Sequence, residues 1–69
     1  GQGVSPDEQR TALALFRDGN AALKEGLFPE AATRYREALK HWDHPAIHYN
    51  LVLALRGLDQ PLELRQHLM

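Results

Sequence analysis

Residues 19–31, with the sequence GNAALKEGLFPEA, decide how this chain folds. The alanine- and leucine-rich part before Gly26 favours helix, and Gly26 suits the left-handed backbone conformation in which many helices end. Pro29 suits the start of a second helix, because the first helical turn does not need the N–H that proline lacks. Since only a few residues separate the two helices, they must be antiparallel neighbours. The stretch therefore predicts a helical hairpin.

The other three prolines also mark helix starts. Ser5 stands before Pro6 and three residues before Glu8, which is a capping-box pattern in which each side chain bonds the backbone of the other residue. Pro45 and Pro61 follow polar residues that can cap a helix. We expect four helices, at about residues 6–25, 29–42, 45–57 and 61–69, with joints near residues 27, 44 and 59.

The composition of the 69 residues agrees with an all-α fold. Twelve leucines and nine alanines stand against two valines, one isoleucine and two threonines, a balance that favours helix over strand. The absence of cysteine excludes disulfides and cysteine zinc sites. A net charge of −1 argues against a nucleic-acid binder, and no apolar run is long enough to span a membrane.

Apolar and small residues recur at intervals of three and four in each expected helix. The stripes are Ala12, Leu15, Phe16, Gly19, Ala22 and Leu23; Ala31, Ala32, Tyr35, Ala38, Leu39 and Trp42; Ile47, His48, Leu51, Val52 and Leu55; and Leu64 and Leu68. The small residues Gly19, Ala22, Ala31 and Ala38 are expected where the first two helices cross, because small side chains let backbones approach closely.

A repeat of about 33 residues relates the two halves, and this is the period of a helix-turn-helix repeat. The spacing of Leu15, Gly19, Ala22, Ala31, Tyr35 and Ala38 resembles the large-Gly-large, small, aromatic, small pattern of the tetratricopeptide family. Tyr49-Asn50-Leu51 resembles the opening of a second unit. The resemblance covers residues 12–69 and implies antiparallel helical hairpins stacked in a right-handed superhelix.

The second unit departs from the family pattern, since Val52 replaces a glycine and Pro61 the aromatic of the turn. We therefore expect a tail or cloning remnant at residues 1–4, a first hairpin at 5–43, and a degenerate or truncated second hairpin at 44–69. The alternative is a plain four-helix bundle with accidental similarity. The chain reads as a segment of a longer protein, and the cytoplasm is slightly favoured as its compartment.

The resemblance implies a protein-interaction module and no catalysis. In the family, the first helix of each unit lines a concave face that receives a peptide or helix. By position, that face would contain Leu13, Phe16, Arg17, Asn20, Leu23 and Lys24, then Ala46, Tyr49, Asn50, Leu53 and Arg56, with Gly57 at its end. Asparagine amides can pair with a peptide backbone and arginine can bind carboxylates, so an acidic partner or a free C-terminal carboxylate is expected.

A carboxylate-clamp subgroup of the family offers a narrower hypothesis. Asn20 and Asn50 match its two asparagines, whereas Phe16 stands where the clamp has a lysine. Two other uses remain open. The chain could serve only as a packing segment of a longer repeat array, or it could self-associate, because two units lack the polar capping helix that such arrays need.

Little in the chain supports an enzyme or a cofactor site. The only serine, Ser5, is expected to cap a helix, and no Gly-rich phosphate loop is present. His41, His44 and His48 fall within eight residues and form a weaker metal-binding hypothesis, because ligands often lie four residues apart on a helix. His48 is more simply explained as an imidazole at the edge of the core. No cofactor is predicted.

Overall fold

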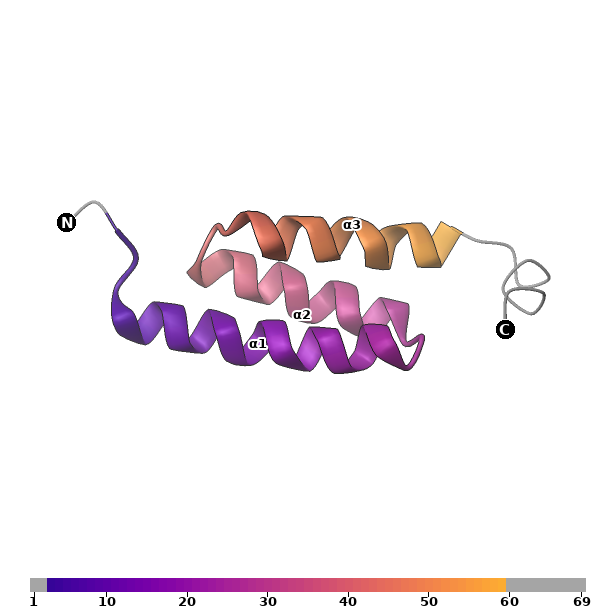
Figure 1. Ribbon diagram of the computed structural model, residues 1–69, viewed down its shortest axis with the longest axis horizontal. Coiled ribbons are helices and arrows are strands. Elements are labelled where there is room, and N and C mark those ends of the chain that lie inside the picture. Colours follow the sequence, from indigo (N-terminus) through magenta and orange to yellow (C-terminus); the bar gives the residue numbers. More distant parts are fainter. Residues whose placement is uncertain (1–2, 60–69) are drawn as a thin grey trace.

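The computed structural model describes residues 3–59, which form three helices joined by short turns (Figure 1). They are α1 (Pro6–Lys24), α2 (Phe28–His41) and α3 (Pro45–Asp59), and this part of the chain contains no strand. The all-α prediction, the first three helices and the joints near residues 27 and 44 are confirmed. The fourth predicted helix, at 61–69, lies outside the described residues. None of the three helices is long and apolar enough to cross a membrane.

The start of α1 is capped as the sequence predicts. The Ser5 hydroxyl accepts a hydrogen bond from the Glu8 backbone N–H at 3.2 Å, and Pro6 occupies the first turn. The Glu8 carboxylate does not complete the predicted reciprocal bond. Instead its Oε2 lies 2.8 Å from Nδ1 of His41, at the end of α2. This contact ties together the two ends of the first hairpin, a long-range use of Glu8 that local spacing does not reveal.

The turn between α1 and α2 depends on Gly26. Its φ of 78° lies in the left-handed region, where a side chain would be strained. The backbone N–H groups of Gly26 and Leu27 bond back to the carbonyls of Leu23 and Ala22, which satisfies the end of α1. Pro29 then lies in the first turn of α2. The chain reverses within a few residues, so α1 and α2 run antiparallel.

Helix α2 supplies four of the eight buried hydrophobic residues, and it packs against both α1 and α3, whereas α1 and α3 touch each other at few points. Tyr35 is completely buried, and an added Cβ on Gly19 would lie 2.5 Å from its ring. Gly19 therefore lies where α1 and α2 approach each other closely. The predicted small residues at this crossing, Gly19, Ala22, Ala31 and Ala38, are all buried.

The inner face of α3 differs from the predicted stripe. Ile47 is buried, but His48 and Val52 are exposed, while Ala54 and Gly57 are buried in their place. A Cβ on Gly57 would lie 2.5 Å from the Phe28 ring of α2. The small residues of α3 thus face α2, because they let its backbone come close. The prediction that His48 is a core-edge residue is wrong: its ring is exposed and contacts Asp43.

Candidate protein-binding face between α1 and α3

The predicted concave face lies along α1 and α3, which both pack on α2 and run in the same direction (Figure 1). We call the residues Leu13, Phe16, Arg17, Asn20, Leu23, Lys24, Ala46, Tyr49, Asn50, Leu53 and Arg56 the α1–α3 face. Leu13, Tyr49, Ala46 and the three basic residues are exposed, and the others are half-buried. Gly57 does not belong to it, because it faces Phe28.

Two asparagines, thirty residues apart in sequence, meet at the middle of this face. Asn50 Nδ2 donates to Asn20 Oδ1 at 2.8 Å, and the Tyr35 hydroxyl donates to the same oxygen at 2.6 Å. Asn20 therefore links α1 to both other helices. Among the described residues, neither the Asn20 amino group nor the Asn50 carbonyl has a hydrogen-bond partner. The pair thus presents one donor and one acceptor, the complement of a peptide group.

Tyr35, in the core beneath the face, holds this amide pair in place through its hydrogen bond to Asn20. Burial raises the pKa of its phenol, because the phenolate would lose its hydration, and a hydrogen bond with Asn50 opposes part of the rise. Its ring also packs against Phe16, with the centroids 5.8 Å apart. The hydroxyl therefore stays protonated as a donor and holds Asn20 in a fixed orientation at neutral pH.

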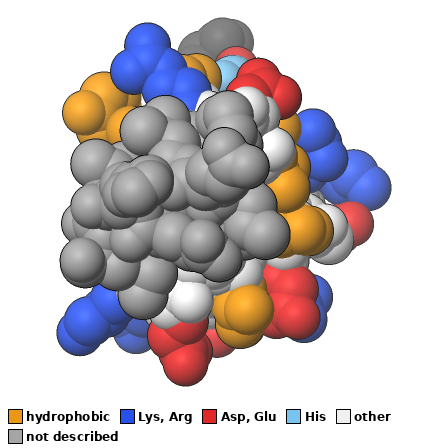
Figure 2. Space-filling model, turned by 90° about the vertical axis from the view of Figure 1, so that its right-hand side faces the viewer, with side chains coloured by type: hydrophobic (Ala, Val, Ile, Leu, Met, Phe, Trp, Pro, Cys, Tyr) orange, Lys and Arg blue, Asp and Glu red, His pale blue; other side chains and the backbone are white. Residues whose placement is uncertain are grey.

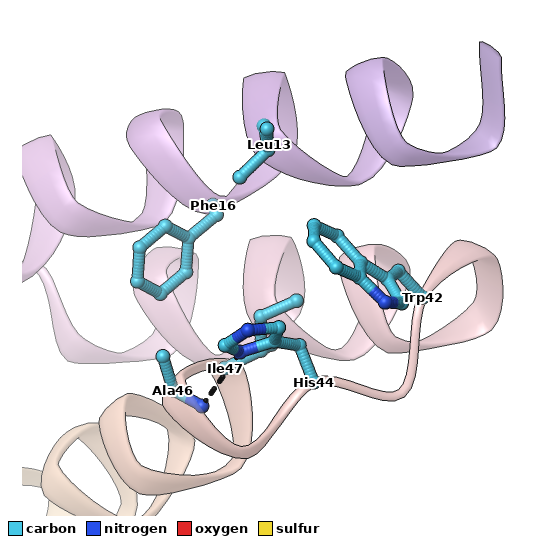
Figure 3. Close-up of a pocket in the computed structure, with 6 residues that line it drawn as sticks. All are labelled: Leu13, Phe16, Trp42, His44, Ala46 and Ile47. Atoms are coloured by element: carbon cyan, nitrogen blue, oxygen red, sulfur yellow. Dashed lines mark hydrogen bonds between the residues drawn. The ribbon is translucent and has the colours of Figure 1, made fainter. Parts of the chain in front are cut away.

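A pocket of about 120 Å³ opens at the end of the face near the α2–α3 turn (Figure 3). Leu13 and Phe16 of α1 line one side, and Trp42, His44, Ala46 and Ile47 line the other. Figure 3 shows the Trp42 indole and the Phe16 ring on either side of the opening, with His44 below them. The lining is mostly apolar, so the pocket suits an apolar group.

The position of His44 in this pocket is set by the start of α3. Its Nδ1 accepts a hydrogen bond from the backbone N–H of Ala46 at 3.0 Å, so the imidazole caps the helix. Its ring meets the Trp42 indole edge-to-face, with centroids 4.7 Å apart. Because Nδ1 is an acceptor, the ring proton lies on Nε2. Neither this group nor Trp42 Nε1–H has an acceptor among the described residues.

The α1–α3 face carries positive charge. It contains Arg17, Lys24 and Arg56 and no acidic residue, although the chain as a whole is close to neutral. Figure 2 shows that acidic and basic side chains are mixed around one end of the bundle. Asp18, beside Arg17 on α1, offsets part of this charge. The remaining positive charge of the face would attract acidic groups more strongly at low ionic strength.

The three clustered histidines do not form one site. His41 contacts Glu8, His48 contacts Asp43, and the Nδ1 of His44 is occupied by the Ala46 N–H. No group of three or more possible ligands gathers anywhere in residues 3–59. The His44–His48 spacing fails to predict a shared ligand position because His44 precedes α3 and its ring packs on Trp42, whereas the His48 ring contacts Asp43.

The sequence prediction did not include several residues that shape this face. Trp42, His44 and Ile47 line the pocket, and Tyr35 orients Asn20 from the core. The sequence placed Trp42 only in the apolar stripe of the second helix, and in the structure it packs against the core while lining the pocket. The hydrogen bond of Tyr35 could have been expected, because Tyr35 lies on a predicted apolar stripe and a buried tyrosine hydroxyl requires a partner.

Comparison with known proteins gives a partial match. Two proteins named photosystem I assembly protein Ycf3 align with 37 residues of this chain. The one from Synechococcus sp. (strain JA-3-3Ab) is 60% identical, and the one from Synechococcus sp. (strain JA-2-3B'a(2-13)) is 57% identical. Each alignment covers 54% of this chain and 21% of the relative, so the chain matches about a fifth of the relatives' length. No family model and no solved structure gives a significant match.

Proposed function

We propose that this chain is a tetratricopeptide-like interaction module that binds an acidic segment of a partner protein on the α1–α3 face and catalyses no reaction. The observation that carries the proposal is the Asn20–Asn50 pair, which offers one free donor and one free acceptor at the middle of a basic face. A peptide group satisfies both at once, and Arg17 and Lys24 lie about one helical turn from Asn20 along α1.

The relatives' name supports a role in assembly. Because the similar proteins are named for the assembly of photosystem I, we propose that the partner is a component being assembled into a larger complex, with photosystem I subunits as the first candidates. The alignment covers 54% of this chain, a length sufficient for a whole helical hairpin. The carboxylate clamp is not part of the proposal, because Phe16 occupies the lysine position and packs on Tyr35.

Overlapping synthetic peptides from photosystem I subunits would test this proposal. The binding of each labelled peptide would be measured by fluorescence polarisation at low and high salt. We expect acidic peptides to bind, and Arg17→Glu and Asn50→Ala to weaken them by about tenfold each, in line with the loss of a charge-assisted or amide hydrogen bond. Arg34→Glu is the matched control, since Arg34 is exposed on α2, away from the face.

Circular dichroism would show whether each variant keeps its helix content. Asn50→Ala is preferable to a change at Asn20, because Tyr35 keeps its partner when only Asn50 is truncated. Equal binding by wild type, Arg17→Glu and Asn50→Ala would refute the assignment of the face. A preference for basic peptides would refute the proposed partner chemistry.

A second candidate function, packing against another copy or another repeat, is favoured by the outer flank of α3. Val52 and Leu58 are 47% and 45% exposed, beside the partly buried Leu51 and Leu55. An apolar flank of this kind is typical of an interface between stacked repeats. Sedimentation equilibrium would test this alternative: a monomer that persists at high micromolar concentration argues against self-association, and a dimer lost in Val52→Glu supports it.

A further inference from the structure

We propose that the pocket lined by Leu13, Phe16, Trp42, His44, Ala46 and Ile47 recognises one aliphatic side chain of leucine size, and that the N–H groups of Trp42 and His44 hold an adjacent main-chain carbonyl. This inference rests on the proposed function and adds the side chain that the partner segment must carry.

The size of the pocket selects the side chain. Its volume is about 120 Å³, and an apolar cavity of about 150 Å³ is large enough to hold benzene. A leucine or methionine side chain therefore fits, whereas an indole is too large. Alanine would leave most of the apolar lining of Phe16 and Ile47 uncovered, so it would gain little from burial.

The polar groups of the pocket select a peptide. Trp42 Nε1–H and His44 Nε2–H are both donors without an acceptor among the described residues, and no carboxylate lines the pocket. A peptide segment brings main-chain carbonyl oxygens, which can accept hydrogen bonds from both donors, together with an apolar side chain for the lining. A bare hydrocarbon would leave them unpaired, which lowers affinity.

The register of the face links the pocket to the Asn20–Asn50 pair. Phe16 lies four residues before Asn20 on α1, and Ala46 lies four residues before Asn50 on α3. One helical turn spans roughly 5–6 Å, and two residues of extended peptide span roughly 6.6 Å. A bound strand can therefore place its aliphatic side chain in the pocket while a peptide group about two residues away pairs with the two amides.

The test uses the single tryptophan of the chain as its reporter. Protein labelled with nitrogen-15 would be titrated with N-acetyl-leucinamide, N-acetyl-alaninamide and N-acetyl-tryptophanamide, and the shift of the Trp42 indole N–H signal would be recorded. We expect the leucine compound to saturate with a dissociation constant on the order of 1–10 mM, as for a small fragment. The alanine and tryptophan compounds should bind at least about tenfold more weakly.

Two matched variants check the location. Ala46→Leu fills the pocket from an exposed position of α3 and should weaken the leucine compound about fivefold or more, while Ala21→Leu makes the same change on the exposed outer side of α1 and should have no effect. His44→Asn keeps a helix-capping acceptor but lacks the Nε2 donor, and it should also weaken binding. Equal binding of the leucine and alanine compounds, or unchanged binding in Ala46→Leu, would overturn the proposal.

A pair of peptides separates this inference from the proposed function. Both peptides are twelve residues long and consist of Gly, Ser and Glu apart from one central residue, which is Leu in one peptide and Ala in the other. If both bind equally well, the face binds acidic peptides but the pocket proposal is refuted. If the leucine compound enters the pocket and neither peptide binds, the proposed function is refuted, whereas the proposal that the pocket recognises a leucine side chain is supported. Tighter binding of the Leu peptide supports both.

Discussion

The substitution Gly19→Ala tests how the first hairpin is packed, because two opposite effects act on one methyl group. Alanine is a better helix former than glycine by about 1 kcal/mol, so helix propensity alone predicts a more stable protein. The added Cβ, however, would lie 2.5 Å from Cε1 and 2.7 Å from Cδ1 of Tyr35. Carbon atoms prefer separations of about 3.5–4.0 Å, so the ring would have to retreat by about 1 Å.

The ring of Tyr35 has no room to retreat. It is fully buried, Phe16 packs against it, and its hydroxyl is held by Asn20 at 2.6 Å. Overpacking of this kind costs about 1–3 kcal/mol, and a broken hydrogen bond to Asn20 would add about 1 kcal/mol. After the gain in helix propensity is subtracted, we expect Gly19→Ala to destabilise the fold by about 1–3 kcal/mol.

Thermal unfolding followed by circular dichroism at 222 nm would measure this effect. In a domain of this size each kcal/mol lowers the melting temperature by about 4–8 °C. Ala21→Gly calibrates the propensity effect at an exposed site two residues away and should cost about 1 kcal/mol. A melting temperature of Gly19→Ala equal to or above that of wild type would show that the α1–α2 crossing is looser than the structure indicates.

Three further predictions concern the cap, the core and the buried phenol. Ser5→Ala should lower the free energy of unfolding by about 1 kcal/mol, because the Glu8 N–H loses its acceptor; urea denaturation measures it, and an unchanged midpoint contradicts the cap. Ala31→Leu should cost about 1–3 kcal/mol, since Ala31 is completely buried between helices; a stability equal to wild type would reveal unfilled space there. The raised pKa of Tyr35 means that the folded state holds this proton more tightly, so stability should fall as pH rises above about 10, and Tyr35→Phe should remove that part of the fall. Urea denaturation at pH 8 and pH 11 compares the two proteins, and identical pH dependence would refute the burial argument.

Much of the fold could be predicted from the sequence because its signals are local. Ser5 caps α1, Gly26 ends it with a positive φ, and Pro29 and Pro45 lie in the first turns of α2 and α3. Each of these effects depends on the backbone within one helical turn, so neighbouring residues suffice to predict it.

The face of α3 could be predicted only in part. The spacing of Leu51 and Leu55 indicates an apolar stripe, but that stripe is wide and continues onto the exposed Val52. The side that becomes buried is the one with Ala54 and Gly57, because the Phe28 ring of α2 occupies the space that a side chain at position 57 would fill. Periodicity gives the approximate direction of such a face, and the shape of the neighbouring helix selects the residues.

The sequence by itself determined an all-α chain with antiparallel first helices, a close crossing at Gly19 and basic residues along one side of α1, since propensity, capping and charge are properties of the residues themselves. Only the tertiary structure brought Asn20 to Asn50 and closed a pocket between Phe16 and Trp42. These contacts join residues 26–30 positions apart, and they form because α1 and α3 both pack on α2, which sets the distance between them.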